Sequence, residues 1–176
     1  MARSSLTRKK GFLQKPRITA STRRRVKLRG ELWPDVKESE LWNRANFTGF
    51  TTIPRTISLI LRIIDELDRK NAARVYLDLW CRSFDDYVIE VRDEYEMAFA
   101  SGYHGQRAVR TWRERLAVIE NFGFVKTHRA SHGAFRLVLL LDPHKVIERL
   151  HEEQKIEEED WIALRSMLIT IGELTD

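Results

Sequence analysis

Basic and amide side chains gather at the start of a predicted helix near the middle of the chain, where their chemistry suits nucleic-acid recognition. In the segment 106–121, apolar residues at helical spacing define one side of the helix. The other side begins with polar and basic residues, namely Gln106, Arg107, Arg110 and Arg113. In the major groove an arginine can bind guanine O6 and N7, and a glutamine can bind adenine. The alternative is that Arg110 and Glu114 form an ion pair on an ordinary solvent-exposed face.

Two neighbouring segments offer further groups that could contact phosphate. The turn before this helix holds Ser101, Tyr103 and His104, which can donate hydrogen bonds to phosphate or, alternatively, cap helices and pack. A predicted hairpin after the helix carries a second set of basic residues: Lys126, His128, Arg129, His132 and Arg136. Such a hairpin can lie against the phosphate backbone or in the minor groove, although a solvated hairpin would have the same composition.

The elements that must position these residues follow from spacing and turn chemistry. The pattern over 94–121 predicts two helices, and Gly102 and Gly105 bracket the turn between them. Gly123 occupies the position of a helix C-cap glycine. Two strands are then predicted, joined by a turn at 130–133 and spanning residues 124–128 and 134–141. A helix-turn-helix followed by a hairpin is the predicted arrangement.

The segment from Glu94 to Phe124 resembles the winged-helix superfamily, in the form found in bacterial transcriptional regulators and plasmid replication initiators. The resemblance rests on an acidic-apolar-alanine run, a turn glycine, a basic stretch and an apolar end: Glu96-Met97-Ala98, Gly102, Val109-Arg110-Thr111, Arg113, Arg115, Leu116, Ile119 and Gly123-Phe124. Together with the flanking elements and the hairpin, over about 51–142, the resemblance covers about half of the chain. The resemblance implies a winged helix-turn-helix fold and a DNA-binding surface that includes Thr111, but no particular operator.

The composition of residues 1–30 predicts a flexible basic arm. Residues 1–29 hold 11 Lys or Arg and no acid, which leaves 20 basic and 26 acidic residues in the rest of the chain. With few apolar residues, this segment cannot bury enough surface to offset its chain entropy. Its clusters Arg8-Lys9-Lys10 and Arg23-Arg24-Arg25, together with Lys27, suit a minor groove or an RNA backbone. A solubilising tail is the alternative.

The remainder, 31–176, is predicted to be a single domain with its core at about 51–142 and C-terminal helices over 143–172. Flanking helices and a strand that could pair with the hairpin are predicted at 54–69, 71–83 and 87–91. The predicted fold class is mainly α with a small β-hairpin wing, a winged helix-turn-helix with extra N- and C-terminal helices.

Between residues 31 and 50, a short helix is expected near 36–43, with large apolar side chains that anchor the segment in the core: Trp33, Leu41, Trp42, Phe47 and Phe50. The final helix, with Trp161 and Leu164 at helical spacing, could fold back onto the helix that starts at Pro54 or form a homodimer with a second copy. We favour the intramolecular arrangement, because the acidic run 152–160 offers a bend.

Composition indicates a soluble cytoplasmic protein without a membrane segment. No apolar run reaches membrane-spanning length, the basic N-terminus lacks the apolar stretch of a secretory signal, and the one cysteine, Cys81, is expected in the core. No cofactor or metal is predicted. His128 and His132 lack a further zinc ligand, and an acidic cluster with Arg92, considered as a nuclease site through Asp86 and Glu90, is a motif short enough to recur by chance.

The sequence therefore predicts a nucleic-acid-binding protein that is not an enzyme. Duplex DNA is the preferred partner and RNA the alternative, with the function of a transcriptional regulator or a replication-initiator-like factor. A second hypothesis is a non-catalytic subunit of a nucleoprotein complex, in which the winged helix is a protein-binding scaffold and the basic arm follows RNA or DNA.

Overall fold

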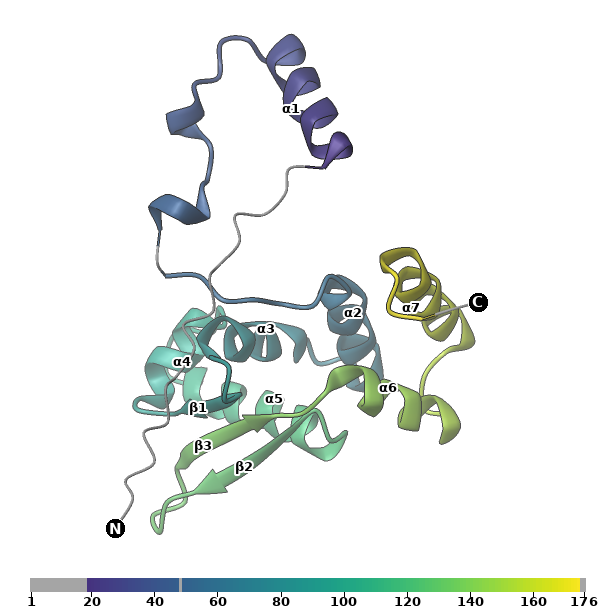
Figure 1. The fold of residues 1–176 in the computed structure, drawn as a ribbon. Helices are drawn as coiled ribbons and strands as arrows, with labels where there is room; N and C mark the ends of the chain where they lie inside the picture. Colours follow the sequence, from purple (N-terminus) through teal and green to yellow (C-terminus); the bar gives the residue numbers. More distant parts are fainter. Residues whose placement is uncertain (1–18, 48, 175–176) are drawn as a thin grey trace, which may run out of the picture. The chain divides into compact units, whose positions relative to one another are not determined.

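A computed structural model describes residues 19–47 and 49–174 of the chain, so the basic cluster at 8–10 lies outside the described residues. The chain divides into two compact units, Met1–Thr48 and Gly49–Asp176. The fold is mainly helical with one small three-stranded antiparallel sheet (Figure 1).

Within residues 19–47, the first unit forms one helix, α1 (Ala20–Leu32), and two short 3-10 turns, η1 (Glu38–Glu40) and η2 (Arg44–Asn46). Thr19 caps α1, because its hydroxyl accepts a hydrogen bond from the amide of Thr22 at 3.2 Å. The composition predicted a flexible basic arm over residues 1–30; residues 20–32 form a helix with no buried side chain. An N-cap threonine followed by arginines, which favour helices, explains this conformation.

Two expectations for the segment 31–50 were wrong. The two 3-10 turns replace the helix predicted near 36–43, and the aromatic side chains are exposed rather than anchored in a core. The exposed fractions are 58% for Trp33, 70% for Trp42, 54% for Phe47 and 43% for Phe50. A three-residue turn is too short to form a continuous apolar side, so these rings do not lie on a helix face that could pack against a core.

The second unit contains the remaining elements. In chain order these are α2 (Ile57–Asp68), α3 (Ala73–Arg82), β1 (Val88–Glu90), α4 (Glu94–Ala100), α5 (Ala108–Asn121), β2 (Val125–Arg129), β3 (Phe135–Leu140), α6 (Pro143–Glu152) and α7 (Glu158–Ile171). The helix-turn-helix and hairpin predicted from the spacing are therefore present as α4, α5, β2 and β3. Helix α2 begins three residues after Pro54 rather than at it, since Thr56 is its N-cap residue.

The sheet has the order β1-β3-β2, so β3 lies in the centre (Figure 1). Val88 of β1 faces Leu139 of β3, and Val125 of β2 faces Leu140 of β3, both in antiparallel register. The prediction that the strand near 87–91 pairs with the hairpin is confirmed. Side chains alternate between the two faces of a sheet, so Ile89 and Val138 are buried against the helices while the other face is solvated.

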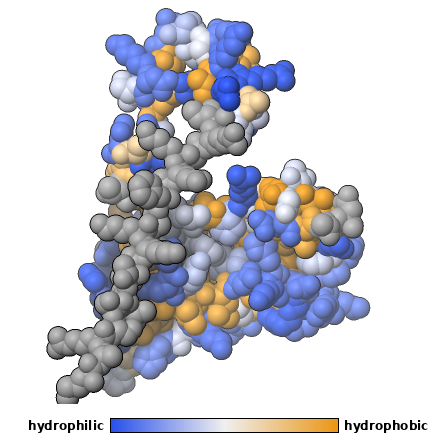
Figure 2. Space-filling view, viewed as in Figure 1, coloured by the Kyte–Doolittle hydropathy of each residue, from blue (hydrophilic) through white to orange (hydrophobic). Residues whose placement is uncertain are grey.

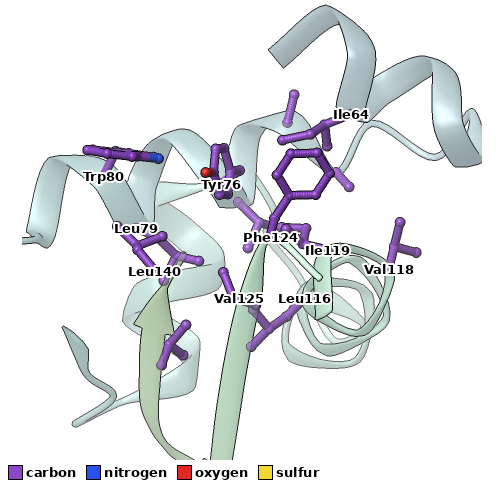
Figure 3. Close-up of a cluster of buried hydrophobic side chains, with 14 of the residues drawn as sticks. Ile64, Tyr76, Leu79, Trp80, Leu116, Val118, Ile119, Phe124, Val125 and Leu140 are labelled. Atoms are coloured by element: carbon purple, nitrogen blue, oxygen red, sulfur yellow. The ribbon is translucent and has the colours of Figure 1, made fainter. Parts of the chain in front are cut away.

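The core of this unit lies between the sheet and helices α3 and α5. Trp112, Leu116 and Ile119 of α5 are fully buried, as their helical spacing predicts. Figure 3 shows Phe124, the residue before β2, beside Tyr76 of α3, and the two rings meet edge to face with their centroids 5.6 Å apart. Helix α5 is thus held on one side by a continuous apolar core.

The end of α5 is closed by a glycine and by an arginine from α6. Gly123 adopts a left-handed conformation with φ of 85°, and the amide of Phe124 bonds the carbonyl of Ile119 at 3.0 Å. Arg149 of α6 donates from Nη2 to the carbonyl of Phe122 at 2.6 Å. The positive φ favours glycine at position 123, and a Cβ atom there would lie 2.9 Å from that guanidinium nitrogen, so the end of the Arg149 side chain would have to move.

Helix α7 packs against α2 and α6, which is the intramolecular arrangement favoured from the sequence. Arg62 of α2 donates to the buried carboxylate of Asp160 at 2.8 Å, and His151 of α6 stacks on Trp161 with ring centroids 4.5 Å apart. Hydrophobic residues also gather on the visible surface over α7 (Figure 2), where the side chain of Ile162 is exposed. A homodimer through this helix remains a prediction.

Candidate nucleic-acid interface

The first turn of α5 presents three polar side chains to solvent. Gln106 and Arg107 precede the helix, Arg107 being its N-cap residue, and Arg110 lies one turn along it; all three are exposed. The turn before them bends at Gly102 and Gly105, with φ of 89° and 80°. Because Ala108 and Trp112 are buried, the core fixes the direction in which these three residues project.

Arg110 is paired with Glu114 in the way that the alternative interpretation predicts. Its Nε atom lies 2.9 Å from a carboxylate oxygen of Glu114. The two side chains are 80% and 51% exposed, and an ion pair at such exposure contributes at most about 1 kcal/mol. Because this ion pair is weak, Arg110 can exchange Glu114 for a phosphate or a base edge.

Arg113 contributes to the architecture of the helix pair. Its Nε atom lies 3.0 Å from both carboxylate oxygens of Glu94, which begins α4. The same carboxylate accepts a hydrogen bond from the amide of Phe135 in β3 at 3.0 Å. The hydrogen bond that Arg113 donates to the Glu94 carboxylate raises the pKa of Arg113 above its usual value. Glu94 therefore links α4, α5 and β3. Arg113 could contact a base only by giving up its bonds to Glu94. Thr111, two residues before Arg113, is half-buried.

In the turn between α4 and α5, two of the three predicted phosphate donors have structural partners. Ser101 is buried and donates to the carbonyl of Met97 at 2.8 Å. The Tyr103 hydroxyl donates to the carbonyl of Asn71 at 2.9 Å, and burial raises its pKa. His104 is exposed. The packing alternative thus describes Ser101 and Tyr103, and only His104 is placed for contact with a ligand.

The hairpin of β2 and β3 carries exposed basic residues along its outer edge and at its tip. Lys126, His128 and His132 are exposed. Arg129 donates to the carbonyl of Gly133 at 3.1 Å, and its guanidinium carbon lies 3.8 Å from the centre of the Phe135 ring. Arg129 thereby stabilises the hairpin turn while its side chain stays at the surface.

A cleft of about 500 Å³ joins the hairpin to the start of α5. Val109 of α5 and His132 of the hairpin tip line this cleft together with Arg92, Tyr95 and Arg136. Arg92 and Tyr95 were not among the predicted nucleic-acid contacts, and Arg136 was predicted only as a basic residue of the hairpin. Arg92 follows β1, and the amide of Val91 bonds the carbonyl of Arg136 at 2.9 Å, so strand pairing brings the two arginines to one edge. The pairing of the strand near 87–91 with the hairpin was predicted from the sequence, and from it Arg92 could have been recognised as a residue of this cleft.

Charge in the second unit is uneven. Residues 49–176 contain 18 Lys or Arg and 22 Asp or Glu, so this unit is net negative by four. Much of the negative charge belongs to the run Glu152–Asp160 at the end of α6 and the start of α7. The first unit, residues 1–48, contains 13 basic and 4 acidic residues. Positive charge is therefore concentrated in the first unit and, within the second, around α5 and the hairpin.

Helix α1 displays the basic residues that the sequence assigned to an arm. Arg23, Arg24, Arg25 and Lys27 are exposed, whereas Arg29 is half-buried and paired with Glu38. Lys27 lies 3.7 Å from Glu31, and Arg25 is 3.4 Å from the hydroxyl of Thr22. These contacts are at the surface, where they contribute little to stability.

The residues considered for other chemistry are separated or paired. Glu90 pairs with Arg92 at 3.1 Å, and the Asp86 carboxylate accepts from the amide of Val88 at 3.3 Å. Among residues 19–47 and 49–174, no three His, Cys, Asp or Glu side chains are grouped as metal ligands would be. Cys81 is exposed, which corrects its placement in the core, and partial desolvation and the nearby Asp78 raise the pKa of its thiol. Cys81 lies on the solvent side of α3, about 200° around the helix from the buried Leu79.

Over the described part of the chain, no helix combines the length and apolar character needed to cross a bilayer. Comparisons of the chain with protein-family models, with curated proteins and with solved structures found no match.

Proposed function

We propose that the second unit is a winged helix that binds duplex DNA through the start of α5 and the hairpin. Support comes from the order α3-β1-α4-α5-β2-β3 with β1 paired to β3, which agrees with the arrangement expected from the sequence. The observation that carries the proposal is that α5 exposes Gln106, Arg107 and Arg110 at its first turn while a core fixes its opposite side.

In this proposal the residues have different tasks. Gln106, Arg107 and Arg110 enter the major groove and read base edges. His104 and the hairpin residues Lys126, His128 and His132 contact phosphates and set the orientation of the helix. Arg113 keeps α5 in place through Glu94. Regulation of transcription or initiation of replication would follow from such binding.

The test is a binding series on duplexes selected from a random library. Replacing Arg107 or Arg110 by alanine should cost about 1–3 kcal/mol on the preferred duplex and leave binding to random duplex nearly unchanged. The matched control is Arg165→Ala on α7, which removes the same charge elsewhere in this unit. If both Arg107→Ala and Arg110→Ala behave like the control, and no duplex is enriched, DNA reading by α5 is excluded.

One observation favours a second candidate, a protein-binding scaffold within a nucleoprotein complex. The outer face of the sheet exposes neighbouring apolar side chains, with Val88, Leu137 and Leu139 being 40%, 36% and 37% exposed. A surface of this kind on an acidic unit suits a protein partner better than a polyanion. Under this candidate, Leu137→Ser would abolish assembly, whereas substitutions at Arg107 and Arg110 would have no effect.

A further inference from the structure

Helix α1 carries its cations in two rows on opposite sides. At about 100° per residue, Arg23 and Lys27 fall on one side of the helix and Arg25 and Arg29 on the other, about 200° away. Arg24 lies between the two rows. None of the side chains of α1 is buried, and its apolar residues are not collected on one face.

This distribution distinguishes between two kinds of anionic partner. A flat lipid surface contacts one side of a helix and requires an apolar stripe to enter the bilayer, which α1 lacks. A groove lined by phosphates on both walls contacts both sides at once. The major groove of B-DNA is about 12 Å wide, and a helix with its side chains is about 10–12 Å in diameter.

We propose that α1 binds inside the major groove of duplex DNA, with the row Arg23/Lys27 on the phosphates of one strand and the row Arg25/Arg29 on those of the other. Lys27 and Arg29 then exchange their surface partners, Glu31 and Glu38, for phosphates. Arg24 then points along the groove floor or out of it. This inference rests on the proposal that nucleic acid is the partner of the chain, and it adds a second site that does not use α5. Each row neutralises phosphates of a different strand.

Binding should also stabilise the helix itself. Three arginines occupy the first turns of α1, no acidic residue lies in its first turn, and Gly30 is within it. Positive charge at a helix N-terminus opposes the helix dipole, and a helix of 13 residues without tertiary packing is marginal in water. Phosphates on both sides would remove the repulsion between the cations. The amides of residues 20–32 should therefore exchange with solvent more slowly when duplex DNA is added to the full chain.

The test measures the salt dependence of binding to a random-sequence duplex by three variants of the full chain. The variants are Arg23→Gln/Lys27→Gln for one row, Arg25→Gln/Arg29→Gln for the other, and Lys37→Gln/Arg44→Gln as a control that removes two charges from the same unit outside α1. Each row variant should lower the magnitude of the log–log salt slope by about 2, because each neutralised phosphate contributes about 0.9. The control should change it by less than about half as much.

Several results would overturn this inference. If the salt slope fell in one row variant and stayed unchanged in the other, only one side of α1 would contact the partner, as on a flat anionic surface. Binding to phosphatidylglycerol vesicles as tight as binding to duplex DNA would indicate a lipid partner. If the major-groove dye methyl green did not compete with the protein for the duplex, binding in the major groove would be excluded. Repeating the series with Arg107→Ala/Arg110→Ala separates the two proposals: the row effects persist there if α1 binds as described, even if α5 reads no DNA.

Discussion

Helix α5 presents a few basic residues from a surface that a core holds still, whereas α1 presents basic residues on both sides of a helix that buries none of its side chains. In α5 the buried Trp112 and the link through Glu94 determine where Arg107 and Arg110 point. In α1 the cations project from a helix without a buried face, and the partners given above for Lys27 and Arg29 are surface ion pairs. Rigid placement suits recognition of base edges, and cations on both sides suit sequence-independent contact with phosphates.

The largest expected effect concerns the core beneath α5. Trp112→Ala should lower the free energy of unfolding of the second unit by about 3–5 kcal/mol, because a fully buried ring that packs on Phe135 at 5.8 Å is removed. Leu28→Ala on the exposed side of α1 should change it by less than about 0.5 kcal/mol. Urea unfolding of the full chain measures both. Comparable losses would mean that α1 has a core of its own and that the contrast between the helices is wrong.

A medium effect is expected at the link between α4, α5 and β3. Glu94→Gln should lower the free energy of unfolding by about 1.5–3 kcal/mol, since the carboxylate bonds Arg113 and the Phe135 amide and its side chain is only 11% exposed. Glu96→Gln on the same helix is the matched control. Its carboxylate is 64% exposed and pairs with Arg82, so the expected loss is below about 1 kcal/mol. Equal losses would show that Glu94 does not hold α5 in place.

The smallest effect is expected at the far end of the basic face of α5. Glu114→Gln should leave stability within about 0.5 kcal/mol and raise affinity for duplex DNA by about twofold to fivefold, because Arg110 loses its exposed partner and one repulsive charge disappears. Glu148→Gln on α6 makes the same charge change outside the proposed contact residues and should leave affinity unchanged at physiological salt. Fluorescence anisotropy with a labelled duplex measures both. An unchanged affinity for Glu114→Gln would place Arg110 outside the contact surface.

Periodicity predicted most of the second unit. Apolar spacing located α2, α3, α5 and the hairpin, since amphipathic elements that face one core repeat at fixed intervals. Gly102 was predicted at the turn and Gly123 as a helix C-cap, and both have the positive φ that glycine favours. Segments without a regular period were predicted poorly. The exposed aromatic residues Trp42 and Phe47 had been assigned to the core on their size alone.

The candidate site was predicted less completely, because partners distant in sequence decide which side chains are free. Arg113 appeared to belong to the exposed basic face, but its partner Glu94 lies 19 residues earlier and meets it only once α4 and α5 have packed. Ser101 and Tyr103 were likewise assigned by type, and the backbone carbonyls that bind them are set by the fold. Arg92 reaches the cleft through pairing between strands.

The contact of Arg149 with the end of α5 determines where the chain could be shortened. Helix α6 follows the hairpin and resembles an appendage, yet its arginine satisfies the carbonyl of Phe122 and fills the space beside Gly123. A fragment ending at Leu141 would leave that carbonyl without its charged donor and weaken the junction between helix and strand. The smallest autonomous form of the proposed DNA-binding unit therefore extends through α6, and its C-terminal boundary is defined by one guanidinium group.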